Sequence, residues 1–422
     1  MLTAAFWLST GTLAPYAATL NEPLALPPCN YLYNIDHGHF EATYFLLDGR
    51  PAQYWASSVV LRRLLFPVLA FPFMKWLGFA SGGVLTSLLL HWAAFALLVW
   101  FAKRTIGVRG AVAAAWLFAT YPGITYCCGL PYSYAAIVPF TVAALVLVRY
   151  LARTESMMHA LLLALGIGVA ATAYDLLPIF GGAVLLIALA RRRPLWLPGM
   201  VIALVAPSAL IALWLTVGKH VPLLNANNAV YSDYVATWLH PSRPKAWAAL
   251  LIRLPELAIR NYVYCAFVFL PFVFAGMLVL NRLGPRLPLE LPERCILVAA
   301  LFLFLLVNAA PPFPPEKISP YIFAPQLRGD GWARLYQGIF VVMLVFSARV
   351  VEATSGRWLG AAVALCALAV LGNASVAFGP ALRVPYAGDV YIGFYRHSPP
   401  EALQRNLDHY GRRPLGFCRP QL

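Results

Sequence analysis

Carboxylates are scarce in this sequence. Of 422 residues, 16 are Asp or Glu and 31 are Lys or Arg, and charged residues make up 11% of the chain. Soluble globular domains carry roughly 25% charged residues, whereas here 61% of the residues are hydrophobic and the mean hydropathy is +0.72. The composition therefore excludes an ordinary soluble domain and predicts a polytopic membrane protein of the all-α class, since no run of strict alternation suggests a barrel.

The sequence also lacks the patterns of a cofactor protein. It contains no internal repeat, no low-complexity tract, and neither an HExxH nor a DxD motif, and its seven cysteines are scattered rather than spaced as metal ligands. We therefore predict no metal and no other cofactor. The formal charge of +15 points to an anionic environment, such as lipid phosphates or a phosphate-bearing substrate, and not to nucleic acid.

Repeated apolar runs of about the length of a membrane span are the main signal in the chain. They cover residues 1–20, 82–101, 110–121, 133–150, 157–173, 176–190, 196–217, 262–280, 295–310, 335–346 and 358–378. These runs predict a bundle of about eleven spans. Segment 64–79 is also apolar, but Pro67, Pro72 and Lys75 interrupt it, so we predict one or two short helices that lie at the membrane interface.

Basic residues occur in every second connection between these runs. The clusters are Lys103, Arg104 and Arg109; Arg149 and Arg153; Arg191, Arg192 and Arg193; Arg282 and Arg286; and Arg349 and Arg357. Because Lys and Arg near helix ends favour the cytoplasm, we place these connections there. This alternation requires that segment 64–79 does not cross the membrane.

The remaining connections are then predicted to lie on the outer side. We expect a transmembrane helical domain over 1–378, with outer loops at 21–81, 218–261 and 311–334, followed by an outer polar tail, 379–422, that packs on the loops. These outer segments are also basic on balance, which the positive-inside rule does not explain. An anionic ligand at the outer leaflet is therefore a hypothesis in its own right.

The stretch 31–67 gathers carboxylates and imidazoles beside the membrane. Asp36 begins a predicted short helix that ends at the turn of Asp48 and Gly49. A carboxylate half shielded by lipid and protein has the raised pKa that suits a general base, and the alternative is that Asp36 only caps the helix. His37 and His39 could contact a phosphate or act as acid and base. Their rings point to different faces of a helix, which is a weak metal signal.

Other candidate binding residues lie in separate outer segments. Arg62 and Arg63 are either headgroup anchors or phosphate ligands. Asp175, in a tight outer turn after Tyr174, is either a functional residue or a helix cap. The long middle loop adds Lys219, Arg243 and Arg260 among aromatic residues. This mixture suits a sugar stacked on a ring beside a bound phosphate, and it also suits an interfacial aromatic belt.

The layout of roughly the first half resembles the GT-C superfamily of polytopic glycosyltransferases. The features that carry the resemblance are an amino-terminal span, an early Asp on a juxtamembrane helix of the first outer loop, an Arg-Arg pair before LLFP, and many further spans with a long middle outer loop. The resemblance implies that Asp36 is the general base and that the donor is a sugar carried on a polyprenyl phosphate. The acceptor would be a hydroxyl of a lipid or glycan, and transfer would invert the anomeric carbon.

Two other functions stay open on the same residues. One is a ligase or polymerase of surface polysaccharide that uses a lipid-pyrophosphate donor. The other is a lipid or polysaccharide transporter, although a transporter should carry ionisable groups near the bilayer midplane, and here they gather at the membrane edge. The Ala-, Leu- and Arg-rich composition suggests a bacterial inner membrane, with the reaction at the periplasmic side.

Overall fold

The computed structural model describes residues 43–44, 46–49, 63–77, 79–120, 134–174, 177–221, 270–284, 286–308 and 337–378. These residues form helices and no strands, which agrees with the predicted all-α class. The helices are α5 (Leu65–Leu77), α6 (Phe79–Thr105), α7 (Val108–Thr120), α9 (Tyr134–Leu151), α10 (Met157–Ala171), α11 (Leu177–Ala190), η1 (Pro194–Trp196), α12 (Leu197–Leu213), η2 (Trp214–Gly218), α15 (Leu270–Leu283), α16 (Leu291–Asn308), α19 (Gln337–Ala353) and α20 (Gly356–Phe378).

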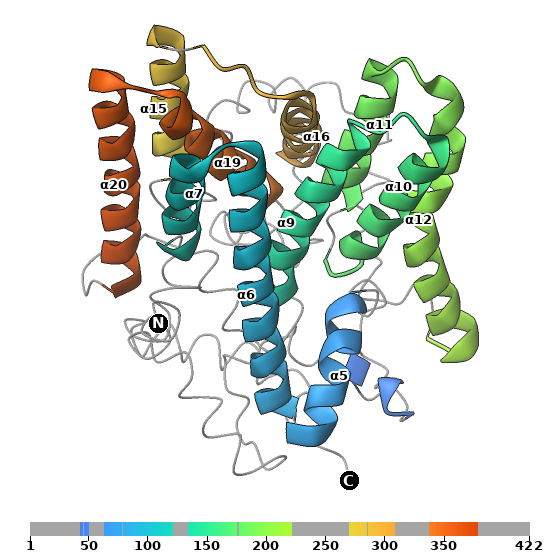
Figure 1. Ribbon diagram of the computed structural model, residues 1–422. Helices are drawn as coiled ribbons and strands as arrows, with labels where there is room; N and C mark the ends of the chain where they lie inside the picture. Colours follow the sequence, from blue (N-terminus) through green and yellow to red (C-terminus); the bar gives the residue numbers. More distant parts are fainter. Residues whose placement is uncertain are drawn as a thin grey trace, which may run out of the picture.

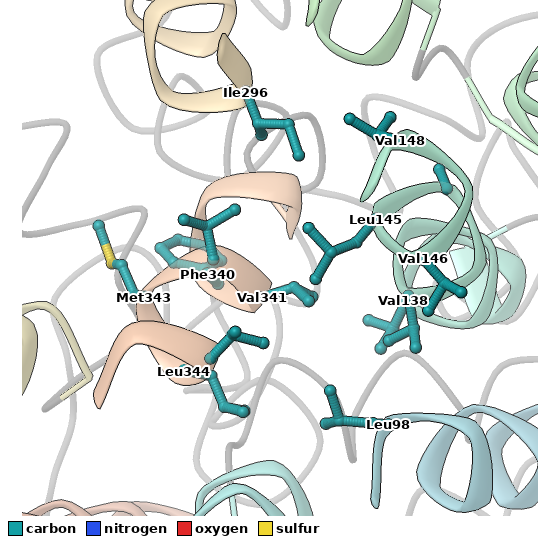
Figure 2. Packing of buried hydrophobic residues seen from close by; sticks show 14 of the residues in the cluster. Leu98, Val138, Leu145, Val146, Val148, Ile296, Phe340, Val341, Met343 and Leu344 are labelled. Atoms are coloured by element: carbon teal, nitrogen blue, oxygen red, sulfur yellow. The ribbon is translucent and has the colours of Figure 1, made fainter. Parts of the chain in front are cut away.

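Helix α19 lies at the centre of the bundle. Every residue from Phe340 to Val351 is buried, and the helix packs against α7, α9, α15, α16 and α20. Figure 2 shows its side chains Val341 and Leu344 in one apolar cluster with Leu145 of α9 and Leu98 of α6. Because α19 is surrounded on all sides, its sequence is apolar all round rather than along one stripe.

Two of the described helical segments are long and apolar enough to cross a membrane. They are Leu85–Thr105, with a mean hydropathy of 1.8, and Pro194–Gly218, with 2.3. Only 17% of the second window is buried, although the helix of a soluble core would bury most of its apolar surface. The other apolar helical stretches that meet the same comparison in the described part, such as Val108–Thr120 and Met157–Ala171, are 10–17 residues long, so the bundle of eleven spans stays a prediction.

Within segment 64–79, for which the sequence predicted one or two short helices, the structure forms one helix, α5, over residues 65–77. Its 13 residues give a length of about 20 Å, which is short of the roughly 30 Å of hydrocarbon in a bilayer. Helix α5 packs beside the start of α6, where a Cβ on Gly82 would lie only 2.3 Å from the backbone nitrogen of Met74. Figure 1 shows α5 in blue beside the lower part of α6.

The five predicted basic connections meet at one end of the bundle, which we call the basic end. They are the turns between α6 and α7, α9 and α10, α11 and η1, α15 and α16, and α19 and α20. Ion pairs join these turns to one another, as described below. Helix α6 runs from α5 at the bottom of Figure 1 to the basic end at the top, so α5 lies at the opposite end of that helix.

Candidate functional site

A short helical segment in the first polar stretch ends where the sequence predicted. Residues 43, 44, 46 and 47 are helical, and the amide of Asp48 donates to the carbonyl oxygen of Tyr44 over 2.9 Å. Gly49 follows with a φ of +78°, a left-handed conformation that glycine adopts without a steric penalty and that commonly ends a helix. The predicted helix end at Asp48 and Gly49 is confirmed. Its predicted start at Asp36 lies outside the described residues.

This segment packs on α5 and on the end of α12. The ring centroid of Tyr44 lies 5.7 Å from that of Phe71, and one turn further along each helix an oxygen of Asp48 lies 2.5 Å from Nζ of Lys75. On its other side, Leu46 forms a small buried cluster with Leu215. The segment therefore joins the first polar stretch to the residues around Lys219.

Arg63 lies against the far end of α10. Its guanidinium carbon is 4.0 Å from the ring centroid of Tyr174, a cation–π distance. Tyr174 is buried and immediately precedes Asp175. One residue from each of two predicted candidate segments is thus adjacent to the other in space, although 111 positions separate Arg63 from Tyr174.

Lys219 follows the π-helical turn η2 at the end of α12. Its Nζ lies 5.6 Å from the ring centroid of Trp214, so the ammonium group stays beside an aromatic face rather than extending freely. The next residue, His220, has a φ of +53°, which turns the chain away from the helix axis. We call residues 43–44 and 46–49, Arg63, α5, Tyr174 and 214–221 together the polar edge.

Seven of the nine sequence-predicted site residues lie outside the described residues. They are Asp36, His37, His39, Arg62, Asp175, Arg243 and Arg260. The structure places Arg63 and Lys219, both on the polar edge. Arg63 follows Arg62 and Tyr174 precedes Asp175, and these two described neighbours are in contact. In the described part of the chain, no group of three or more His, Cys, Asp or Glu could hold a metal ion.

The structure also contains a buried ionic cluster at the basic end that the sequence did not indicate. An oxygen of Glu290 lies 2.9 Å from Nη2 of Arg149, and the two oxygens of Glu293 lie 2.6 and 2.7 Å from the guanidinium of Arg349. The Glu293 side chain is 2% exposed. Burial raises the pKa of its carboxyl above the ordinary value, and the guanidinium of Arg349 opposes that rise.

Local sequence explains how Glu293 reaches this position. Glu290 precedes α16, and its amide donates to the carboxylate of Glu293 over 2.7 Å, which is half of a capping box. The sequence placed Arg149 and Arg349 in the positive-inside clusters, and the structure shows that both are buried. Arg349 lies near the carboxyl end of the buried helix α19, and there its guanidinium meets Glu293 in the first turn of α16.

Two further sets of ion pairs complete the basic end. The carboxylate of Glu352 accepts a hydrogen bond of 2.8 Å from the amide of Gly110 and lies 3.9 Å from Nε of Arg109. The carboxylate of Glu155 binds the guanidinium groups of Arg191 and Arg193. All four acids thus link turns that are distant in the sequence.

One ionisable residue is buried inside a candidate span. His91 of α6 is 4% exposed, and its ring centroid lies 5.2 Å from that of Phe118. The sequence predicted ionisable groups at the membrane edge, whereas the structure places His91 well within the segment Leu85–Thr105, with no hydrogen-bond partner for Nδ1 among the described residues.

Comparison of the chain with protein-family models, with curated proteins and with solved structures finds no match in any of the three.

Proposed function

We propose that this protein is an inverting glycosyltransferase of the GT-C type, which moves a sugar from a polyprenyl phosphate to an acceptor hydroxyl at the outer face of a bacterial inner membrane. The observation that supports this most is the contact between Arg63 and Tyr174. It brings a predicted phosphate ligand to the residue that precedes Asp175, at the end of the bundle opposite the basic turns.

The proposed orientation in the membrane follows from the charges at the two ends of the bundle. The five turns of the basic end carry the Lys and Arg clusters, which favours the cytoplasm. The polar edge then faces outward, and α5 lies along the membrane surface without crossing it. On this orientation the polar stretch 31–67 is outside, where a lipid-linked donor and an acceptor can meet.

In the proposed reaction, Asp36 takes the proton from the acceptor hydroxyl while that oxygen attacks the anomeric carbon. The bond from this carbon to the phosphate oxygen breaks, and attack from the opposite face inverts the configuration. Negative charge grows on the leaving phosphate, so cations placed there stabilise the transition state. The candidates are Arg62, Arg63, Lys219, Arg243 and Arg260, with His37, His39 and Asp175 as further substrate contacts. No metal is needed, because the phosphate is already a good leaving group.

Sugar transfer by the purified protein in lipid, with and without chelator, tests this proposal. We expect Asp36→Asn to lower turnover by about 100- to 10,000-fold, which is the usual contribution of a general base. Asp48→Asn is the matched control, because it makes the same chemical change in the same stretch at a carboxylate that pairs with Lys75. Unchanged turnover in Asp36→Asn would remove the general-base assignment.

His91 supports the transporter as the second candidate, since ionisable residues within membrane spans commonly mark transport pathways, and among the described residues Nδ1 of His91 has no hydrogen-bond partner. Flux of a lipid-linked sugar across proteoliposomes, without chemical transfer, would favour that function. The same assay with His91→Phe would then separate a transport role from packing against Phe118.

A further inference from the structure

Helices α15 and α20 form an open apolar groove of about 660 Å³. Its walls are made only of apolar side chains and glycine, among them Gly276, Val279, Ala361, Ala364, Leu365 and Leu368. Pockets that take a small ligand or one of its chains measure roughly 300 to 1,000 Å³. The groove therefore has the size and the surface for a hydrocarbon chain, and it offers no partner for a polar one.

Small residues on both helices shape this groove. Gly276 lets α15 approach closely, because a Cβ there would lie 2.9 Å from a methyl carbon of Leu365. Eight positions along α15, Gly284 lies beside Trp358 near the start of α20. The two helices are thus antiparallel, and the same end of both belongs to the basic end. The wall residues Val279 and Leu368 are more than half exposed, so the walls continue into an apolar outer surface.

Each wall of the groove leads to an arginine at the basic end. Arg357 precedes Ala361 by four positions and so lies on the groove side of α20, whereas Arg282 follows Val279 by three positions and lies at the edge of the groove on α15. Both side chains are exposed. Within the described part of the chain neither forms an ion pair, in contrast to Arg149 and Arg349 of the buried cluster.

We propose that this groove binds an acyl chain of an anionic phospholipid whose phosphate lies between Arg282 and Arg357. The guanidinium of Arg357 is 5.0 Å from the ring centroid of Trp358, and Trp and Arg at one level are typical of the headgroup region. Basic pockets between membrane helices bind anionic headgroups, and guanidinium suits phosphate because it can donate two parallel hydrogen bonds. This site is separate from the polar edge and needs only that α15 and α20 lie in a membrane.

Native mass spectrometry of the whole protein, mixed with phosphatidylglycerol and phosphatidylcholine in equal amounts, tests this proposal. We expect the wild type to retain phosphatidylglycerol preferentially. In Arg282→Gln/Arg357→Gln the ratio of the two bound lipids should fall about 25-fold, because each basic residue beside an anionic headgroup contributes about a factor of five. Ala364→Phe fills the groove and should reduce binding of both lipids.

Lys103→Gln/Arg104→Gln is the control, because it removes two exposed charges from the same end of the bundle but from α6. It should leave the lipid ratio unchanged. The proposal is wrong if the ratio of bound phosphatidylglycerol to phosphatidylcholine falls equally in this control, or if it stays high in Arg282→Gln/Arg357→Gln. It is also wrong if the protein binds a polyprenyl phosphate in preference to phosphatidylglycerol. A wild-type dimer that Ala364→Phe dissociates would show that a second copy of the chain, and not a lipid, occupies the groove. The melting temperature of each variant first shows whether it is folded. Arg282→Lys/Arg357→Lys keeps both charges and should retain the preference for phosphatidylglycerol.

Discussion

At the basic end, carboxylates hold the helices together, whereas at the polar edge aromatic and apolar side chains make most of the contacts. Glu290 and Glu293 pair with arginines from α9 and α19, while the polar edge relies on the pair Tyr44 and Phe71 and on Arg63 over an aromatic ring. Ion pairs that join several turns fix one arrangement of the helices. The polar edge is joined by fewer charged contacts among the described residues, which suits its proposed role of admitting substrates.

Because acidic residues are scarce, only some of the basic residues at the basic end have a carboxylate partner in the described part of the chain. The described ion pairs of the basic end use Glu155, Glu290, Glu293 and Glu352, and each lies in or beside a short turn. Their positions leave the exposed arginines of the same turns, such as Arg282 and Arg357, available for lipid phosphate. Charge pairing and charge excess therefore coexist at one end of the molecule.

The largest expected effect comes from breaking the buried cluster. Glu293→Gln removes the buried carboxylate that pairs with Arg349 and leaves that guanidinium only the more exposed Glu290, 3.1 Å away. Removal of one partner of a buried pair destabilises a protein by about 3–5 kcal/mol. Unfolding in detergent by heat or denaturant measures this loss. Glu155→Gln is the matched control, because its side chain is 66% exposed and an exposed pair contributes only about 0–1 kcal/mol. Equal losses in both variants would contradict the difference between buried and exposed pairs.

A second prediction concerns Arg63 at the polar edge. If this guanidinium holds the donor phosphate, Arg63→Gln should lower kcat/KM for sugar transfer by about 10- to 100-fold, since hydrogen bonds to charged groups contribute about 1.5–3 kcal/mol. Arg63→Lys keeps the charge and should recover part of the activity. Lys75→Gln removes a charge near the end of α5, the helix that follows Arg63, and should have little effect on transfer. Full activity in Arg63→Gln would limit Arg63 to its contact with Tyr174.

The sequence predicted the local features of both ends and missed their long-range contacts. Alternating clusters of Lys and Arg predicted that five turns share one end, and the Asp48 and Gly49 turn predicted the end of a helix; both are found in the structure. Helical periodicity and turn residues are local signals, so they can be read from neighbouring positions.

The contacts of Arg349 and Arg63 could not be predicted in this way. Glu293 is 56 positions from Arg349, and Tyr174 is even further from Arg63. Such pairs depend on how the helices pack, and no local pattern encodes packing. One signal was available: Glu290 and Glu293 have the spacing of a capping box, which could have indicated the start of α16 but not the burial of Glu293.

A third prediction tests the helix pair that connects the two ends. Helices α10 and α12 start near the basic end and lead toward Tyr174 and Lys219, and they pack closely at Gly168. A Cβ there would lie 2.5 Å from the carbonyl oxygen of Leu204, so Gly168→Ala must separate the helices. We expect a loss of about 1–3 kcal/mol, as for other overpacked sites, measured by thermal unfolding.

Gly360→Ala provides the control for Gly168→Ala. Nothing lies within 4 Å of a Cβ at Gly360, and alanine in a helix interior is favoured over glycine by about 0.5–1 kcal/mol. This variant should therefore be as stable as the wild type or slightly more stable. If Gly168→Ala were equally harmless, the close packing of α10 on α12 would be wrong.

The smallest expected effect is at the ion pair of the polar edge. Asp48 and Lys75 are 2.5 Å apart, but the Lys75 side chain is 54% exposed, and water and salt screen such a pair. Asp48→Asn should therefore reduce the free energy of unfolding by only about 0.2–1 kcal/mol, with a smaller loss at high salt. Melting curves of both proteins at two salt concentrations measure this. A salt-independent loss as large as that of Glu293→Gln would mean that the polar edge depends on charge pairing as the basic end does, and that the two ends differ only in which residues form the pairs.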